Sequence, residues 1–206
     1  MTDAASDASA DQPSAPRLLI AEDEAIIRLD LKEMLEEEGY TVVGEAADGE
    51  AAIRLARERS PDLVIMDVKM PGMDGLTAAG VIVDEQLGAV LILTAFSQRD
   101  LVQKAAEAGA MGYLVKPFQK SDLMPAIDIA LARHAQLSAV RDESANLSEQ
   151  LDTRKAVDKA KGRLMDGQGM SEADAFRHIQ KRAMNERRSM RAIADEIVEG
   201  VGSGPN

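Results

Sequence analysis

A short apolar run that ends on a carboxylate constrains the fold of this chain more than any other feature. Residues 63–66 contain no polar residue, and Asp67 follows them directly. An apolar run without alternation is typical of a central strand in a parallel sheet covered on both faces. In such sheets, reactive groups collect beyond the carboxyl ends of the strands. Asp67 therefore lies where chemistry is expected, although most single aspartates at a strand end only cap a turn.

Three other apolar runs decide between these interpretations, because each also ends on a polar or charged side chain. Residues 17–21 lead into Glu22 and Asp23, residues 89–93 into Thr94, and residues 111–115 into Lys116. Carboxylates suit Mg²⁺, whereas a lysine and a hydroxyl group suit the oxygens of a phosphoryl group. The four strand ends together predict a magnesium site at which the carboxylate of Asp67 attacks phosphorus and becomes an aspartyl phosphate.

Helical patterns separate the apolar runs. Apolar residues recur at helical spacing in residues 24–38, 49–59, 73–84 and 98–108, and residues 41–45 form a further short strand. Strand and helix thus alternate five times. This alternation predicts an α/β fold with a doubly wound, five-stranded parallel sheet and right-handed crossovers.

A long helix followed by two shorter ones is predicted after the sheet region. The long helix begins near Ser121, a candidate N-cap, and runs to about Met165. Ser171 and Ser189 are expected to cap the two shorter helices, which completes a small all-α three-helix domain. A stripe on the long helix has the spacing of a short coiled coil and can pair with a second copy or pack within the monomer. Its residues are Leu137, Val140, Ser144, Leu147 and Leu151.

Composition and charge limit the setting and the partners. The 206 residues include no cysteine, no apolar run near the ~20 residues that span a bilayer, and no signal-peptide pattern. We therefore expect a cytoplasmic protein without disulfide chemistry and without a membrane partner. Residues 1–150 hold 13 Lys and Arg against 27 Asp and Glu, whereas residues 151–206 hold 11 against 9. Only the C-terminal part is a candidate for binding a polyanion.

On the strand-end motifs and the Lys116-Pro117 pair, residues 17–137 resemble the receiver domain of bacterial two-component response regulators. The resemblance implies the flavodoxin-like strand order 2-1-3-4-5, a Mg²⁺ cofactor and a sensor histidine kinase as partner. It also implies roles for single residues: Asp67 as the phosphoacceptor; Glu22, Asp23, Asp67 and the main-chain carbonyl of Lys69 as the metal ligands; Thr94 and Lys116 as the switch hydroxyl and the phosphate-sensing lysine; and Tyr113 as an aromatic side chain that turns inward on activation.

Three C-terminal motifs resemble the ANTAR domain, an RNA-binding three-helix module of antitermination regulators that recognises paired hexaloop hairpins in nascent transcripts. These motifs are residues 156–165 (AVDKAKGRLM), 171–176 (SEADAF) and 183–185 (AMN), and the resemblance extends over about residues 148–200. Phe176 falls in the apolar pattern and is expected in the core, so contacts from basic residues to RNA phosphates are favoured. The candidate RNA-binding residues are Lys159, Lys161, Gly162, Arg163, Lys181, Arg182, Arg187, Arg188 and Arg191.

Gly162 stands out among these candidates. A glycine inside a helix costs about 1 kcal/mol relative to alanine, which indicates close approach of another helix or of a ligand.

These observations predict five segments: a disordered leader (1–16), a receiver domain (17–137), a helical or coiled-coil linker (138–150), an ANTAR domain (151–200) and a flexible tail (201–206). We expect a regulator of the actinobacterial type rather than an enzyme. A sensor histidine kinase phosphorylates Asp67, and binding of hairpin RNA then controls transcription antitermination, with a phosphorylation-dependent homodimer as one route for the switch. A DNA-binding output and a protein-interaction output are the alternatives. Acidic residues late in the last helix disfavour the former.

Overall fold

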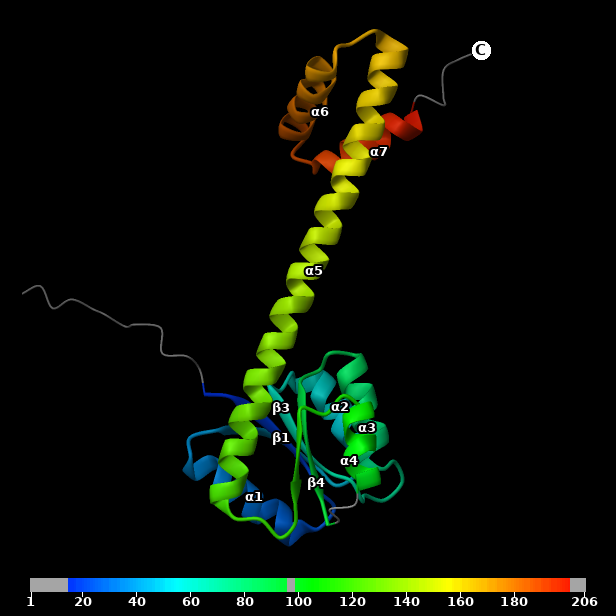
Figure 1. Ribbon diagram of the computed structural model, residues 1–206. Helices are drawn as coiled ribbons and strands as arrows, with labels where there is room; N and C mark the ends of the chain where they lie inside the picture. Colours follow the sequence, from blue (N-terminus) through cyan, green and yellow to red (C-terminus); the bar gives the residue numbers. More distant parts are fainter. Residues whose placement is uncertain (1–14, 96–98, 201–206) are drawn as a thin grey trace, which may run out of the picture. The chain divides into compact units, whose positions relative to one another are not determined.

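Five parallel strands form the sheet of the N-terminal part of the chain, in the order β2-β1-β3-β4-β5 (Figure 1). The computed structural model describes residues 15–95 and 99–200. The strands are β1 (Arg17–Ala21), β2 (Thr41–Ala46), β3 (Leu63–Asp67), β4 (Ala89–Thr94) and β5 (Gly112–Val115). In the centre of the sheet, Leu63 of β3 lies opposite Leu18 of β1 and Ala89 of β4. The fold class and the strand order are those predicted from the sequence.

Helices cover both faces of this sheet (Figure 1). On one face lie α1 (Ala25–Glu37) and the beginning of α5 (Lys120–Gln168); on the other lie α2 (Gly49–Arg59), α3 (Gly75–Asp84) and α4 (Arg99–Glu107). Successive side chains of a strand point to opposite faces, so Ile65 packs with α1 and α5 and Met66 with α2 and α3. All five residues of β3 are buried, which explains why its sequence lacks polar alternation.

Aspartates cap two of the helices on the second face. An oxygen of Asp48 accepts the backbone N–H of Ala51 at 2.7 Å, and an oxygen of Asp74 accepts that of Thr77 at 2.8 Å. Each bond satisfies one of the backbone donors that a helix leaves unpaired in its first turn. The caps fix where α2 and α3 begin, and the start of α3 matters for the site described below.

The predicted cap of α5 is wrong. The helix begins at Lys120, so Ser121 lies within its first turn. The carboxylate of Asp122 accepts the backbone N–H of Gln119 at 3.0 Å instead. This bond is the half of a capping box in which a side chain in the first turn reaches back to the backbone N–H of the residue before the helix.

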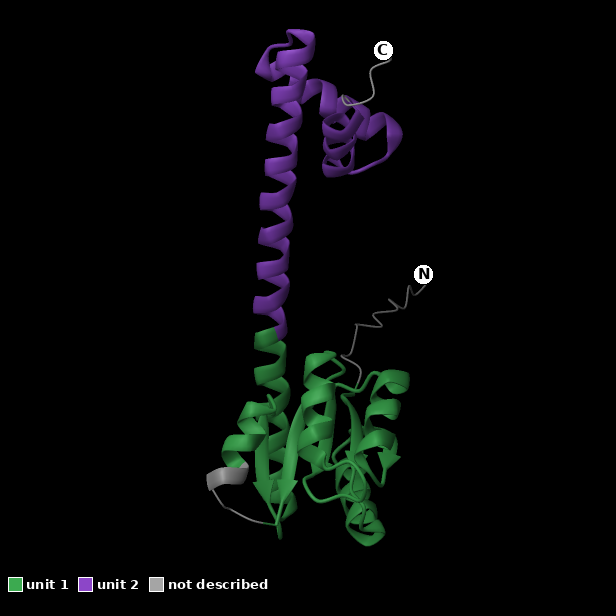
Figure 2. Ribbon diagram, turned by 90° about the vertical axis from the view of Figure 1, so that its right-hand side faces the viewer, with its two compact units in different colours: residues 1–137 green, residues 138–206 purple. Residues whose placement is uncertain are grey.

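A second compact unit follows the first, with the division between residues 137 and 138, inside α5 (Figure 2). It contains the rest of α5, α6 (Glu172–Glu186) and α7 (Met190–Gly200). Ser171 accepts the N–H of Asp174 at 3.2 Å and Ser189 accepts that of Ala192 at 3.1 Å, which confirms both predicted caps. The buried core of the unit is small and consists of Val157, Ala160, Leu164, Ala175, Ile179, Ala183, Ile193, Ala194 and Ile197.

Phe176 is not part of this core, contrary to the sequence prediction. Its exposed fraction is 41%, because the preceding Ala175 takes the inward position on α6. The coiled-coil stripe is also exposed in the described structure, so packing of the stripe within the monomer is not found there. Its apolar members are Leu137, Val140, Leu147 and Leu151, with exposed fractions between 46% and 64%.

Two further expectations concern the ends of the chain and membranes. The predicted leader and tail lie outside the described residues, apart from residues 15 and 16. Within the part of the chain that the structure describes, no helix combines the length and the apolar character needed to cross a membrane.

Candidate functional site

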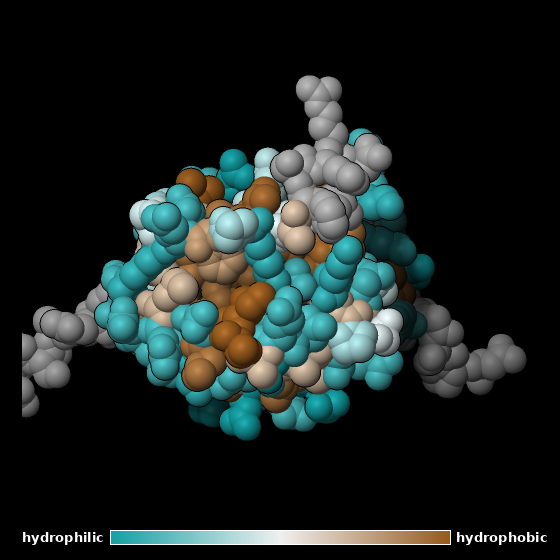
Figure 3. Space-filling model, turned by 90° about the horizontal axis from the view of Figure 1, so that it is seen from below, coloured by the Kyte–Doolittle hydropathy of each residue, from teal (hydrophilic) through white to brown (hydrophobic). Residues whose placement is uncertain are grey.

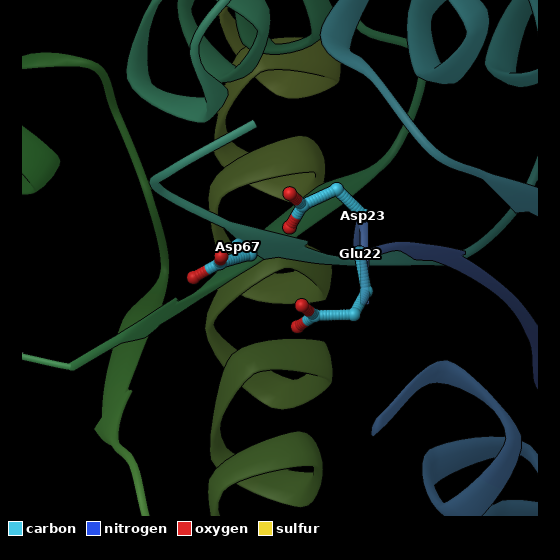
Figure 4. Close-up of side chains that lie close together, drawn as sticks. All are labelled: Glu22, Asp23 and Asp67. Carbon is cyan, nitrogen blue, oxygen red and sulfur yellow. The ribbon is translucent and has the colours of Figure 1, made fainter. Parts of the chain in front are cut away.

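Three carboxyl groups meet at the end of the sheet to which the strands of Figure 1 point. Asp67 is the last residue of β3, and Glu22 and Asp23 follow β1 directly. One oxygen from each lies within 4.8 Å of the others, and Figure 4 shows the side chains of Glu22 and Asp23 extending toward the side on which Asp67 lies. Glu22 is fully buried, Asp67 is 7% exposed and Asp23 is exposed. Two desolvated carboxylates therefore face a third that solvent reaches.

Lys116 neutralises part of this negative charge. Its Nζ lies 2.6 Å from Oε2 of Glu22 and 3.2 Å from Oδ1 of Asp67. Lys116 follows β5, and its backbone N–H donates to the carbonyl of Thr94 at 2.8 Å, so pairing with the end of β4 holds the lysine over the site. The next peptide bond, to Pro117, is cis.

Burial dominates the protonation equilibria of the two buried carboxyl groups. Burial raises the pKa of Glu22 and of Asp67, and the hydrogen bonds and charge of Lys116 offset this only in part. Burial acts against the charged form of Lys116, but the hydrogen bond to Glu22 and the charge of Asp67 outweigh it, and its pKa is raised. A further cation would stabilise both buried carboxylates in their ionised form.

The donor set fits Mg²⁺. This ion binds through a few carboxylates and keeps its other positions for water and phosphate oxygens. Asp23 and Lys69 line one open depression of about 550 Å³ together with the start of α3. The sequence prediction of a ligand from the backbone carbonyl of Lys69 is compatible with this placement, and the position of any ion stays a prediction.

Gly75 is a residue of the site that the sequence pattern did not predict. A Cβ added at this position would lie 1.9 Å from the carbonyl oxygen of Asp67 and 2.8 Å from its carbonyl carbon. The N–H of Gly75 donates to the carbonyl of Val68 at 2.9 Å, which draws the start of α3 against the end of β3. In the sequence, the Asp74-Gly75 pair is typical of a turn, but it does not indicate that the turn returns to the carbonyl of Asp67.

Thr94 and Tyr113, the other two predicted switch residues, differ in their placement. Thr94 is the last residue of β4 and is 3% exposed; the neighbouring Leu93 is paired with Asp67. Tyr113 lies on β5 opposite Ile92, and 47% of its surface is exposed. The structure therefore brings Thr94 to the site in the sheet register, and it places Tyr113 at the surface of the edge strand.

The basic residues of the second unit fall into two groups. Four predicted RNA-binding residues make ion pairs: Lys161 with Asp158 and Glu172, Arg182 and Arg188 with Glu186 and Glu196, and Arg191, more distantly, with Asp152 and Asp195. Within the described ranges, the other four have no acidic partner within 4.0 Å and are exposed: Lys159, Arg163, Lys181 and Arg187. The second group is free to contact a polyanion without breaking an existing pair.

Gly162 has open space around it. A Cβ there would meet no heavy atom of a neighbouring element within 4 Å in the described structure. Of the two explanations offered for this glycine, close approach by another helix is therefore not found in the described part of the chain, whereas approach by a ligand remains consistent.

The fold and the cluster around Asp67 define a receiver domain, and comparisons with known proteins agree. The model of the response regulator receiver domain matches residues 18–128, and the model of the ANTAR domain matches residues 145–198. The chain belongs to the response regulators, with an ANTAR domain after the receiver. It is 54% identical over 203 residues, or 98% of both chains, to the transcriptional regulatory protein PdtaR of Mycobacterium tuberculosis.

Solved structures resemble the receiver part. The receiver domain of the response regulator NarL from Mycobacterium tuberculosis matches with a TM-score of 0.56 and 30% identity over 58% of this chain and 98% of that one. CheY from Borrelia burgdorferi, in a complex with CheX, BeF₃ and Mg²⁺, matches with a TM-score of 0.52 and 26% identity over 54% of this chain and 85% of that one.

Proposed function

We propose that a sensor histidine kinase phosphorylates this response regulator on Asp67. The observation that carries the proposal is the position of Asp67, which ends β3 beside two further carboxylates and 3.2 Å from Lys116. In the transfer, an oxygen of Asp67 forms a bond to phosphorus while the bond between phosphorus and the kinase histidine breaks, and the nitrogen keeps the electron pair. Lys116 balances the charge that gathers on the phosphoryl oxygens. Thr94 offers these oxygens a hydroxyl donor, which couples β4 to the phosphorylated state.

We assign Mg²⁺ to Glu22, Asp23, Asp67 and the carbonyl of Lys69. Mg²⁺ bound there would supply positive charge for the phosphoryl oxygens. The related CheY complex contains Mg²⁺ together with BeF₃, which supports the assignment. Two hydrogen bonds fix the backbone of Glu22. Arg28 donates to the carbonyl of Glu22 at 2.5 Å, and the N–H of Glu22 donates to the carbonyl of Ala46 at 3.0 Å.

The receiver surface also suits a protein phosphodonor. A pocket of about 430 Å³ beside Lys116 is lined by apolar side chains of α1 and of the loop after β5, among them Ile27, Met34 and Phe118. Ile26 on the same helix is 78% exposed. Figure 3 shows apolar residues gathered in one area of the lower face, with hydrophilic residues around it. An apolar surface of this kind favours a docked protein over a small phosphodonor alone.

For the output, we propose binding of hairpin RNA and transcription antitermination by residues 151–200. Support comes from the ANTAR match, from the four exposed cations that have no acidic partner among the described residues, and from the open space around Gly162 there. The relative PdtaR is named a transcriptional regulatory protein, which agrees with an output in gene expression. Nascent transcripts are found in the cytoplasm, so we assign the protein to that compartment.

A DNA-binding output is less well supported. Glu196, in the second half of α7, forms ion pairs with both Arg182 and Arg188, so these two arginines are already engaged by an acidic residue of the helix that would have to approach DNA.

We also propose that the exposed stripe around Val140 and Leu147 of the linker (138–150) pairs with a second copy once Asp67 is phosphorylated. The stripe has coiled-coil spacing and, in the described structure, no apolar partner.

Incubation with a small phosphodonor such as phosphoramidate in the presence of Mg²⁺ tests the first step. We expect the protein to become acid-labile phosphoprotein, and expect Asp67→Asn or chelation of Mg²⁺ to abolish the product. Asp62→Asn is the matched control, because Asp62 lies at the opposite end of β3 and an amide oxygen can still accept the N–H of Arg17. Phosphorylation of Asp67→Asn at the wild-type level would refute the assignment of the phosphoacceptor.

A further inference from the structure

A groove in the second unit differs in its lining from the exposed cationic surface, by which we mean Lys159, Arg163, Lys181 and Arg187. It has a volume of about 640 Å³ and lies between α5, α6 and the start of α7. Its lining includes an aromatic ring, two amides, a hydroxyl and side chains of both charges. The residues that matter below are Gln150, Thr153, Arg154, Lys161 and Phe176.

Phe176 is exposed although it is one of the largest apolar side chains of the second unit. The core positions of α6 are Ala175, Ile179 and Ala183, and all three are buried. Phe176 lies one residue outside this row, is 41% exposed and turns its ring to the groove wall. Exposure of a large aromatic side chain on so small a unit forgoes burial that the core could use. A ligand that covers the ring would recover this burial.

The charges of the groove disfavour an anion inside it. Asp158 is one of its walls, and Lys161 is held by Asp158 at 2.7 Å and by Glu172 at 2.8 Å. The charge of Lys161 is therefore already balanced by two carboxylates, so Lys161 lines the groove and is not a phosphate ligand. A phosphate group placed here would meet a carboxylate and a lysine that is already paired. A neutral planar heterocycle meets neither problem.

The polar groups that line the groove together with Phe176 suit the edge of such a heterocycle. Gln150 offers both a donor and an acceptor, and Thr153 offers a hydroxyl that can act as either. The side chain of Arg154 is 82% exposed, with Asp158 as a distant partner at 4.0 Å. Arg154 can thus reach a phosphate at the mouth of the groove while the groove itself holds a base.

We propose that this groove holds one unstacked nucleobase of a single-stranded RNA loop, with the base stacked on Phe176. The proposal rests on the RNA-binding function proposed above and adds the element that reads a base. Aromatic stacking of bases that are splayed out of a loop is a common mode of RNA recognition. Lys161 was a predicted RNA-binding residue, and this arrangement changes its role to that of a wall.

The base groove and the phosphate contact proposed for Lys159 can be tested separately because the groove and Lys159 lie on different sides of α5. Lys159 is two residues from the groove residue Val157, which is about 200° around the helix axis. Loss of a phosphate contact lowers the dependence of the affinity on salt, whereas loss of a stacked base lowers the affinity and leaves that dependence unchanged.

The experiment measures binding of the full-length protein, with Mg²⁺ and beryllofluoride, to RNA hairpins with six-nucleotide loops at several salt concentrations. We expect Phe176→Ala to weaken binding about tenfold or more with an unchanged salt slope, and Phe176→Tyr to stay near wild type. Lys159→Ala should lower the salt slope by about one. Met184→Ala is the matched control, because Met184 is also on α6 and 74% exposed but does not line the groove.

Hairpins with an abasic nucleotide at each loop position in turn locate the base. At one position, the loss of affinity caused by the abasic nucleotide should disappear in Phe176→Ala, because both changes remove the same stack. Wild-type affinity of Phe176→Ala for RNA would overturn the groove assignment and leave the RNA-binding function intact. Absence of hairpin binding by the wild-type protein would overturn both. Weaker self-association of Phe176→Ala, with RNA binding unchanged, would assign the groove to a second copy of the chain instead.

Discussion

At the scale of single residues, the site depends on side chains that the sequence identifies and on one backbone approach that it does not. Asp67, Glu22, Thr94 and Lys116 could be predicted because each ends or follows an apolar run, and parallel strands end at one edge of the sheet. The need for a glycine at position 75 could not be predicted, because it arises from the path of the loop between β3 and α3. Only the folded chain shows that this loop returns to the carbonyl of Asp67.

Gly75→Ala should therefore damage the site and the fold together. A Cβ at 1.9 Å from a backbone oxygen forces the backbone to move, and overpacking of this kind costs about 1–3 kcal/mol. We expect the free energy of unfolding in urea to fall by about that amount, with slower phosphorylation of Asp67.

Gly80→Ala is the control for this prediction. Gly80 lies in the same helix, and a Cβ there would meet nothing within 4 Å. We expect it to stabilise α3 by about 0.5–1 kcal/mol. Equal effects of the two substitutions on unfolding would contradict the close approach at Gly75.

At the scale of elements, the helices and strands follow from periodicity, but the partners of their surface residues do not. The caps at Ser171 and Ser189 could be predicted from residue type and spacing alone. The sequence pattern wrongly predicted Phe176 in the core, because Phe176 is next to the buried row of α6 and a shift of one residue separates core from surface. The ion pairs of Arg182 and Arg188 depend on how α6 and α7 approach each other, and no local pattern encodes that approach.

Gly162→Ala separates stability from function within α5. An alanine fits the open space and is the better helix former, so the thermal midpoint of unfolding should rise, by an amount that corresponds to about 1 kcal/mol. If RNA approaches the helix backbone there, the added methyl group should nevertheless weaken hairpin binding. Thermal unfolding and hairpin binding are measured on the same preparations. A more stable variant with unchanged RNA affinity would remove Gly162 from the interface.

At the scale of the whole molecule, two units with different chemistry are joined through one helix. The N-terminal unit is acidic at its functional site and suits a cation and a phosphoryl group, whereas the C-terminal unit carries the exposed cations. Sequence similarity to PdtaR runs through both units over 98% of the chain, so the combination of the two is shared with that protein. We propose that phosphorylation of the first unit governs RNA binding by the second.

The measurement that tests this coupling most directly is the dissociation constant for hairpin RNA with and without beryllofluoride and Mg²⁺, for the wild-type protein and for Asp67→Asn. We predict that beryllofluoride tightens wild-type binding by about 5- to 100-fold, within the usual range of allosteric coupling, and leaves Asp67→Asn unchanged. Duplex DNA serves as the competitor. An unchanged wild-type affinity on loading with beryllofluoride, or an equal response of Asp67→Asn, would contradict the proposed control of RNA binding by Asp67.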